Sequence, residues 1–423
     1  MQPATTGTEV LTSLSQIQEA LQNISSVIQP TPLQRNHNFS EQYQCNIFLK
    51  REDLQIVRSY KIRGAFHKIS SLTESQKSKG VVCASAGNHA QGVAYACNKL
   101  GISGKIYMPH TTPKQKVSQV RMFGKKFVEI VLSGDTFDDA SLAAHRDSEE
   151  NGLSFIHPFD DPKVIAGQGT VGMEIFRDSL SPIDYIFVPV GGGGLASGLG
   201  SFIKQVSPQT RIIGAEPAGA PAMKKSLEAG KRVQLEQIDK FVDGAAVRMV
   251  GSLSFAACQH ILDDVVLIPE GEVCASILQL YNQEAIVAEP AGALSIAALD
   301  QYKDEIKEKN VVCLISGGNN DITRTEEIKE RALLHQGLKH YFIITFPQRA
   351  GALRDFLVDV LGENDDIAHF EYTKKNAREK GPALVGIETK SRSDFEELIG
   401  RMNEKKINFQ YLNNQSELFH FLV

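Results

Sequence analysis

The sequence contains no long apolar run. No stretch approaches the roughly 18 consecutive apolar residues that a membrane-spanning helix needs. Residues 1–14 are polar and lack the apolar core of a secretory signal peptide. We therefore expect a cytoplasmic protein with neither a signal peptide nor a membrane partner.

An excess of positive charge is absent too. The 45 Lys and Arg residues face 50 Asp and Glu residues, which gives a formal net charge of −5. Proteins that bind nucleic acid or an anionic membrane surface usually carry a basic patch. We therefore expect no nucleic-acid partner.

Paired cysteine motifs are also missing. The six cysteines form no C-x-x-C pair and have no histidine cluster beside them. Most lie among apolar or small residues, as in the segments 81–84 (VVCA) and 311–314 (VVCL). We expect buried, reduced thiols instead of disulfides.

The chain does have the length and apolar content of a multidomain globular protein. Its 423 residues are 42% hydrophobic, which is sufficient for two or three domains with substantial cores. In the first part, short apolar runs alternate with helical segments. Such alternation predicts an α/β fold, with mainly parallel open sheets flanked by helices. The predicted strands are residues 46–50, 80–84, 105–108, 127–131, 183–190, 211–215 and 311–315.

The pattern changes after Gly317. A charged helix is predicted over residues 323–334, and the elements after it follow the order β-α-β-β-α-β of a ferredoxin-like module. We predict a division near residue 335, into a large α/β part (1–335) and a small α+β part (339–413, with a tail to 423). The predicted elements of the small part are strands at 339–346, 367–372, 383–388 and 409–412, and helices at 352–361 and 393–405.

Four consecutive glycines, 191–194, lie between a predicted buried strand and a helix. Without side chains, their backbone N–H groups can approach an anion closely, and the helix N-terminus adds partial positive charge. The segment has no G-K-[ST] and does not fit G-x-G-x-x-G, so neither common nucleotide-binding loop applies. It predicts a phosphate site.

A second turn, Ser85-Ala86-Gly87-Asn88-His89, also opens a helix after a strand. Its N–H groups, the Ser85 hydroxyl and the Asn88 amide could receive a carboxylate. The alternative is an ordinary capped helix start. We interpret His89 as a structural residue.

Lys61 has no special meaning by itself, because most lysines are solvated surface charges. Its surroundings, Ser59-Tyr60-Lys61-Ile62-Arg63-Gly64-Ala65, resemble the cofactor-lysine motif of the fold-type II pyridoxal phosphate enzymes, and of the threonine dehydratases in particular. Four further segments resemble that family in the same order, over roughly residues 25–330. They are residues 85–92 (SAGNHAQG), 191–195 (GGGGL), 289–293 (EPAGA) and 316–319 (SGGN).

The resemblance implies a role for each segment. Lys61 would hold pyridoxal 5′-phosphate as a Schiff base and would take the Cα proton of the substrate. Asn88 would hydrogen-bond the ring hydroxyl oxygen of the cofactor, and the Ser316 hydroxyl would face the pyridine nitrogen without protonating it. The cofactor phosphate would lie against Gly191, Gly192, Gly193, Gly194 and Leu195, and the substrate against Ser85, Ala86, Gly87 and Asn88.

The implied activity is the conversion of L-threonine to 2-oxobutanoate and ammonia, the first step toward isoleucine, with L-serine as a slower substrate. Two alternatives stay open: an L-serine dehydratase or another β-eliminase or synthase of the same fold, and a non-catalytic amino-acid sensor. Related racemases carry a divalent-cation site that begins at a glutamate. Here Glu216 occupies that place, but Ala222 stands where a second carboxylate is expected, so we predict no metal.

Residues 339–413 resemble the ACT-like regulatory domain of biosynthetic threonine dehydratases. The segment 346–353 (FPQRAGAL) resembles its strand-to-helix turn, so Arg349, Gly351 and Ala352 are the predicted contacts for a branched-chain amino-acid effector, isoleucine or valine. A dimerisation module is the alternative. The resemblance also implies a homotetramer and a small subdomain, roughly 55–155, inserted into the catalytic part.

Overall fold

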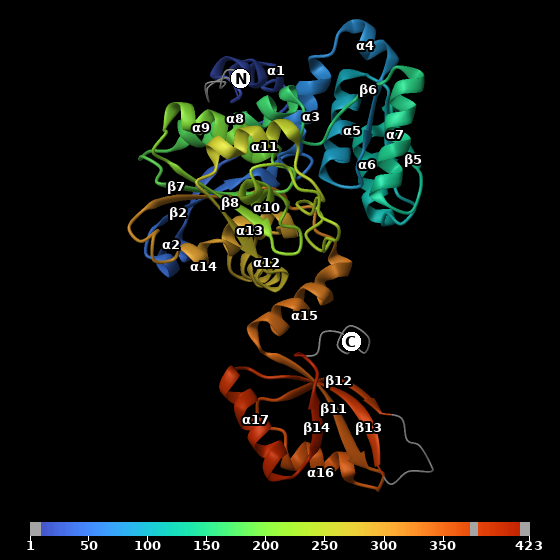
Figure 1. The fold of residues 1–423 in the computed structure, drawn as a ribbon, viewed down its shortest axis with the longest axis vertical. Coiled ribbons are helices and arrows are strands. Elements are labelled where there is room, and N and C mark those ends of the chain that lie inside the picture. The colour runs from blue at the N-terminus through green and yellow to red at the C-terminus, as the bar shows by residue number, and fades with distance from the viewer. Residues whose placement is uncertain (1–9, 373–379, 415–423) are drawn as a thin grey trace. The chain divides into compact units, whose positions relative to one another are not determined.

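The computed structural model describes residues 10–372 and 380–414, and the chain forms two compact units, Met1–Asp321 and Ile322–Val423 (Figure 1). The predicted tail beyond residue 414, and the first nine residues of the polar segment 1–14, lie outside the described residues. The helix α15 (Thr325–Gln336) falls in the second unit. The domain limits 1–335 and 339–413 and the inserted subdomain stay predictions.

The first unit contains a six-stranded sheet with the order β1-β2-β10-β7-β8-β9. All neighbouring strands are parallel except β1 and β2, which form an antiparallel pair. Because β7 and β10 are parallel neighbours, the segments that follow them start from the same edge of the sheet. The strands are β1 (Leu33–Asn36), β2 (Asn46–Arg51), β7 (Tyr185–Pro189), β8 (Arg211–Pro217), β9 (Asp264–Ile268) and β10 (Asn310–Ile315).

The same unit contains a smaller, wholly parallel sheet with the order β5-β4-β3-β6. A separate apolar core, which includes Ile62, Val93 and Ile106, packs around it. Its strands are β3 (Val81–Ala84), β4 (Gly104–Met108), β5 (Val128–Leu132) and β6 (Ser154–Phe155). The α/β class with two mainly parallel sheets is confirmed.

Helices cover these sheets, and Figure 1 shows α8 and α9 on the opposite side of the large sheet from α12 and α13. The helices are α1 (Leu14–Ile24), α2 (His37–Tyr43), α3 (Lys61–Ser70), α4 (Glu74–Lys79), α5 (Asn88–Leu100), α6 (Lys114–Gly124), α7 (Phe137–Asn151), α8 (Pro162–Asp178), α9 (Gly194–Val206), α10 (Ala222–Ala229), α11 (Ser252–Ile261), α12 (Glu270–Glu284), α13 (Pro290–Ala297) and α14 (Leu299–Tyr302). Short 3₁₀ turns lie at Glu52–Leu54, Lys125–Phe127 and Ile322–Arg324.

A buried ion cluster fixes helix α3 against α8. The Arg63 guanidinium donates to Glu52 Oε1 at 2.8 Å and to Glu174 Oε1 at 2.7 Å. Lys50 Nζ donates to Glu174 Oε2 at 2.6 Å. None of these four side chains is more than 2% exposed, and two cations balance two anions. Arg63 lies two residues after Lys61 in α3. The cluster therefore holds the first turn of this helix, and with it the backbone of Lys61, in one position.

The second unit, after α15, is an antiparallel sheet with the order β12-β13-β11-β14 and two helices. Its apolar core includes Phe342, Val385 and Leu398. The predicted β-α-β-β-α-β order is confirmed. The elements are β11 (Lys339–Pro347), α16 (Ala352–Asp359), β12 (Asp366–Tyr372), β13 (Lys380–Glu388), α17 (Arg392–Glu404) and β14 (Asn408–Tyr411).

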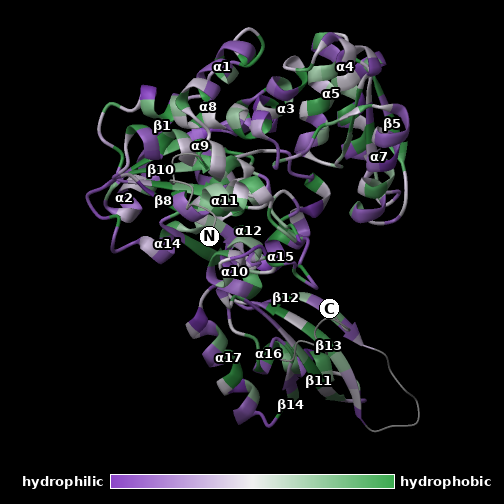
Figure 2. Cartoon of the chain, turned by 45° about the horizontal axis from the view of Figure 1, so that its top comes forward, coloured by the Kyte–Doolittle hydropathy of each residue, from purple (hydrophilic) through white to green (hydrophobic). Residues whose placement is uncertain are grey.

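Hydrophobic residues concentrate in the buried strands, and hydrophilic residues are common on the outer helices. In Figure 2 strand β10 is mostly hydrophobic, whereas α7 and α17 carry many hydrophilic residues. All six cysteines are free and buried, as predicted. Among the helices of the described residues, none is long and apolar enough to cross a membrane.

Candidate active site

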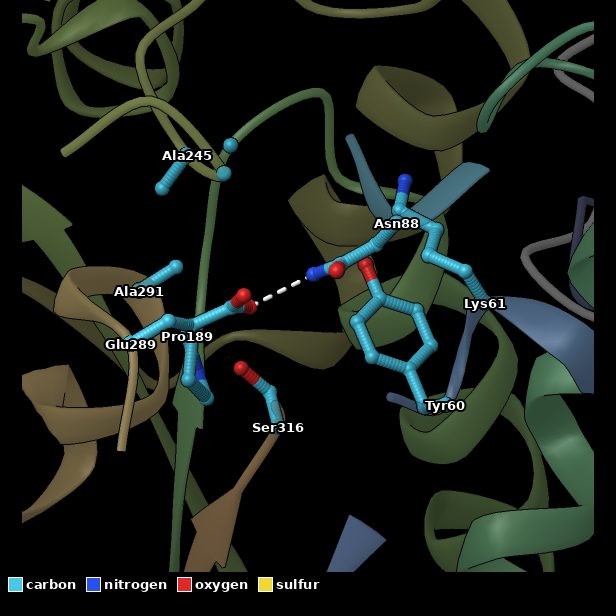
Figure 3. A pocket seen from close by; sticks show the side chains of 10 residues that line it. Tyr60, Lys61, Asn88, Pro189, Ala245, Glu289, Ala291 and Ser316 are labelled. Atoms are coloured by element: carbon cyan, nitrogen blue, oxygen red, sulfur yellow. Dashed lines mark hydrogen bonds between the residues drawn. The ribbon is translucent and has the colours of Figure 1, made fainter. Parts of the chain in front are cut away.

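The carboxyl ends of β7 and β10 border a small, partly open cavity with about 290 Å³ of space between atoms, open solvent included. Four of the predicted site residues contribute to its wall: Lys61, Asn88, Gly191 and Ser316. Figure 3 shows Lys61, Asn88 and Ser316 around the same space, although they come from three distant segments of the chain.

Lys61 is the first residue of α3. Its Nζ donates a hydrogen bond to the carbonyl oxygen of Pro158 at 2.9 Å. Burial lowers the pKa of Lys61 to about 8, and the negative charge of Glu289 opposes this shift only in part. An amine with this pKa is neutral in roughly a tenth of molecules at pH 7, far more often than an ordinary lysine. A neutral amine is what bond formation with an aldehyde requires.

The glycine loop runs from β7 into the N-terminus of α9, and it is packed too closely for side chains. A Cβ on Gly192 would lie 2.4 Å from the ring of Phe159, and a Cβ on Gly191 would lie 2.8 Å from the backbone of Ala245. Gly193 has a φ of +91°, which side chains disfavour. The first N–H groups of a helix lack intrahelical partners, so those at the start of α9 can receive an anion. The loop therefore fits a phosphate group.

Leu195 differs from the glycines in its packing. Its side chain is 3% exposed and belongs to the apolar core of the large sheet. Only its backbone N–H, in the first turn of α9, is suited to the predicted phosphate contact.

Ser316 follows β10 directly and is 1% exposed. Its carbonyl oxygen accepts a hydrogen bond from Tyr60 N at 3.2 Å, which joins the end of β10 to the residue before Lys61. Figure 3 shows its hydroxyl directed into the cavity. A hydroxyl there can donate to a ring nitrogen without supplying a charge.

Asn88 begins α5, and both ends of its amide are hydrogen-bonded. Its Nδ2 donates to Glu289 Oε1 at 2.6 Å, and its Oδ1 accepts from Asn319 Nδ2 at 2.7 Å. Glu289 is 6% exposed. Burial raises the pKa of Glu289 to about 7, and the charge of Asp243 adds to this shift.

Sequence reasoning assigned no role to Glu289, Asn319 or Tyr60. Glu289 and Asn319 lie inside the segments 289–293 and 316–319, which were recognised as similar to the family. That similarity marked the segments but assigned no role to these two residues. Tyr60 and Glu289 both contribute to the cavity wall.

Ser85, Ala86 and Gly87 form the turn between β3 and α5. Gly87 N donates to Ser85 Oγ at 3.2 Å. A Cβ on Gly87 would meet no atom within 4 Å, so space is open in front of this turn. Substrate binding by these residues stays a prediction.

Glu216 caps a helix instead of joining other carboxylates. Its Oε1 accepts from Met223 N at 2.6 Å and its Oε2 from Lys224 N at 2.9 Å, at the start of α10. Burial raises the pKa of Glu216 to about 8. Residues 10–372 and 380–414 contain no group of three or more His, Cys, Asp or Glu side chains that could hold a metal ion.

In the second unit, Arg349, Gly351 and Ala352 lie where β11 turns into α16. Gly351 has a φ of +83°, and α16 begins at Ala352. Arg349 is exposed, and its Nη2 donates to Asp355 Oδ2 at 2.8 Å. Their predicted regulatory role stays a prediction.

Comparison with known proteins places this geometry in a family. Residues 24–317 match the family described as pyridoxal-phosphate dependent enzyme, and residues 330–422 match the C-terminal regulatory domain of threonine dehydratase. Among solved structures, the processed form of threonine deaminase isoform 2 from Solanum lycopersicum superimposes with a TM-score of 0.74 and 42% identity, over 79% of this chain and 91% of that chain.

Full-length relatives are closer in sequence. The chain is 59% identical over 404 residues to L-threonine dehydratase biosynthetic IlvA of Halalkalibacterium halodurans, with 96% of this chain and 97% of the relative covered. It is 58% identical over 413 residues to the protein of the same name in Bacillus subtilis, with 98% of each covered. The chain therefore belongs to the family of biosynthetic L-threonine dehydratases, pyridoxal-phosphate dependent enzymes with a C-terminal regulatory domain.

Proposed function

We propose that this protein converts L-threonine to 2-oxobutanoate and ammonia, with pyridoxal phosphate on Lys61. The observation that carries the proposal is a buried lysine, with a pKa lowered to about 8, in the same cavity as Ser316 and Gly191, the first residue of the glycine loop. The atoms balance: the elimination releases one water, and the later hydrolysis that frees ammonia consumes one. When bound, the cofactor withdraws electrons from the substrate Cα.

Each predicted cofactor-binding residue has a task in this proposal. The N–H groups of Gly191 to Leu195 bind the cofactor phosphate, and Ser316 donates to the pyridine nitrogen. Asn88 donates to the ring oxygen. Lys61, once displaced by the substrate amine, takes the proton from Cα. A lysine that must accept a proton near neutral pH needs a lowered pKa, and burial supplies it.

Substrate choice rests on a small difference. L-serine lacks one methyl group of L-threonine, and one methyl in a pocket changes the free energy of binding by about 1–3 kcal/mol. We therefore propose that L-serine is a slower substrate, with the backbone N–H groups of the turn Ser85–Gly87 and of Asn88 holding the carboxylate of either one. The open space in front of Gly87 supports this location.

A 2-oxo-acid assay with L-threonine, L-serine and their D-forms tests this function. The expected result is that L-threonine gives the highest kcat/KM and that both D-forms are inert. Faster turnover of L-serine would favour a serine dehydratase or another β-eliminase. Absence of turnover with every amino acid, despite bound cofactor, would favour a non-catalytic sensor.

We further propose that the second unit binds a branched-chain amino acid, isoleucine in the first place, at the turn between β11 and α16. The N-terminus of α16 and the exposed Arg349 are suited to a carboxylate. Such an effector acts through a coupling free energy, typically about 1–3 kcal/mol, or roughly a 5- to 150-fold change in affinity. A homotetramer and a cytoplasmic location complete the proposal. The six free, buried cysteines agree with a reducing compartment.

Two arginine variants of the full chain test the effector site. Arg349→Ala should weaken inhibition by isoleucine at least fivefold while it leaves turnover of L-threonine without effector near wild type. Arg392→Ala removes another exposed arginine of the same unit and should leave inhibition unchanged. Equal inhibition in both variants would place the effector elsewhere, and light scattering on the same samples would test the tetramer.

A further inference from the structure

The Asn88 amide is held in a chain of hydrogen bonds whose direction is fixed at one end. Asn319 Nδ2 donates to the carbonyl oxygen of Val57 at 2.8 Å and to Asn88 Oδ1 at 2.7 Å. A backbone carbonyl can only accept, so Asn319 must present its nitrogen on this side. Asn88 must then present its oxygen to Asn319 and its nitrogen to Glu289.

The other end of the chain agrees with this direction. Asn88 Nδ2 donates to Glu289 Oε1 at 2.6 Å. A carboxylate accepts only, and with a pKa of about 7 Glu289 is mainly a carboxylate above neutral pH. Side-chain amides are ambiguous by themselves, because either orientation fits the same shape. Here the Val57 carbonyl, acting through Asn319, removes the ambiguity, and the ionised form of Glu289 agrees with it.

Space for this network depends on Gly317. A Cβ on residue 317 would lie 2.4 Å from Glu289 Oε1 and 3.2 Å from Asn88 Nδ2. The backbone also supports the network, because Glu289 N donates to the carbonyl oxygen of Gly317 at 3.1 Å. The segment Ser316–Asn319 therefore contributes the side chains of Ser316 and Asn319 to the site. Between them, Gly317 leaves the space that Glu289 and Asn88 occupy.

One hydrogen of Asn88 Nδ2 is left for a ligand. Within residues 10–372 and 380–414, this nitrogen makes one hydrogen bond, to Glu289, and Asn88 contributes to the wall of the cavity. In Figure 3 the amide lies between Glu289 and Lys61. Asn88 can thus meet a bound molecule as a donor, whereas its oxygen is engaged by Asn319.

We propose that Asn319 is a positioning residue that, with Glu289 as the terminal acceptor, makes Asn88 a hydrogen-bond donor only, aimed at the ring oxygen of the cofactor. This inference rests on the proposed function, because it assumes that the cofactor occupies this cavity. A donor aimed at that oxygen stabilises its ionised form. Without the hydrogen bond from Asn319, the Asn88 amide can turn its oxygen to the cavity. The ring oxygen then keeps its proton to a higher pH.

Other ionisable groups act on the same oxygen, so the test must separate charge from orientation. Tyr60 and Lys61 at the start of α3 and Glu289 before α13 contribute to the cavity wall. Asp243 and Lys116 act on Glu289 through their charges, and Lys116 Nζ lies 2.5 Å from Asp243 Oδ2. A charged substitution must therefore be matched by a neutral one and by the same charge at a neighbouring position.

The experiment is a pH titration of the absorbance of the bound cofactor, in the full-length protein without substrate. Asn319→Asp cannot donate to Val57 or to Asn88, and Asn319→Leu removes the donor without adding charge. Both should raise the midpoint of the transition by about one to two pH units, which corresponds to the loss of a hydrogen bond to a charged group. Asn320→Asp and Asn320→Leu are the matched controls, since Asn320 accepts from Asp321 N and has no bond to Asn88.

Glu289→Gln should not raise the midpoint of the absorbance transition. It keeps an acceptor for Asn88 and removes a negative charge, so its midpoint should stay at the wild-type value or fall. If the midpoints of both Asn319 variants match those of the Asn320 controls, or if Glu289→Gln alone raises the midpoint, the inference is overturned. If an Asn319 variant does not fold, as judged by circular dichroism, the other one and Glu289→Gln decide. Wild-type protein that binds no cofactor would instead contradict the proposed function.

Discussion

Replacing Gly192 by alanine should weaken cofactor binding, because the added methyl group would collide with the ring of Phe159. The added Cβ would lie 2.4 Å from the ring of Phe159, well inside normal contact distance. The loop cannot retreat freely, because the carbonyl oxygen of Gly192 accepts from Ser254 Oγ at 2.5 Å and from Gly251 N at 3.2 Å. Phe159 or the loop must therefore move.

The magnitude follows from these contacts. Overpacking by one methyl typically costs about 1–3 kcal/mol. A loop that shifts also loses hydrogen bonds worth about 0.5–1.5 kcal/mol each. If about 1–3 kcal/mol of this cost falls on the cofactor-bound state, affinity for pyridoxal phosphate drops roughly 5- to 150-fold.

Gly87→Ala is the matched control, since Gly87 also stands in a glycine turn that opens a helix of the site. Its φ is −127°, and a Cβ there would meet no atom within 4 Å. Titration of cofactor-free protein with pyridoxal phosphate, followed by absorbance, measures both dissociation constants. Wild-type affinity in Gly192→Ala, or an equal loss in Gly87→Ala, would refute the steric argument.

Two further predictions concern charge. Because burial lowers the pKa of Lys61 to about 8, the rate of cofactor uptake by cofactor-free protein should rise about tenfold per pH unit below pH 8 and level off above it, as followed by stopped-flow absorbance. A rate that does not depend on pH would contradict this assignment. Arg63→Met leaves Glu52 and Glu174 buried without that partner and should lower the free energy of unfolding by about 3–5 kcal/mol in urea, whereas the exposed Arg177→Met should change it by about 0–1 kcal/mol. Equal effects of the two arginine variants would contradict the role of the buried cluster.

Most strands with strong apolar runs were predicted from the sequence, although β9 (Asp264–Ile268, sequence DVVLI) was missed. Weak or glycine-rich elements were missed as well. The predicted strand at residues 80–84 is observed as β3, Val81–Ala84, one residue shorter. Helix α8 was missed because three glycines, at 167, 169 and 172, make its sequence resemble a loop. A Cβ on Gly167 would lie 2.6 Å from Gly64 Cα, so close packing against α3 requires this glycine and overrides its low helix propensity.

Short polar elements were missed for a different reason. Strand β1, Leu33–Asn36, has the sequence LQRN, without an apolar run or a clear alternation. It becomes a strand because β2 offers an antiparallel partner, with Leu33 paired to Lys50. The sequence of β1 alone therefore does not predict a strand, because its formation depends on pairing with β2.

The site shows the same limit. Lys61, Asn88, Gly191 and Ser316 were predicted as site residues, and the structure brings them around one cavity. The bond from Asn88 to Glu289 joins residues 201 positions apart, and the bond from Asn319 to Asn88 spans 231. No local pattern specifies such pairs, so sequence reasoning recognised the motifs and missed the network that connects them.

The most direct test of the central claim is to locate the cofactor chemically. Wild-type protein with bound pyridoxal phosphate is reduced with borohydride, digested and mapped by mass spectrometry. We predict that the cofactor stays covalently attached to the peptide that contains Lys61, and that Lys61→Ala yields no labelled peptide while it keeps the wild-type circular dichroism spectrum. A label on any other lysine, or L-threonine turnover by Lys61→Ala without an added amine, would contradict the account.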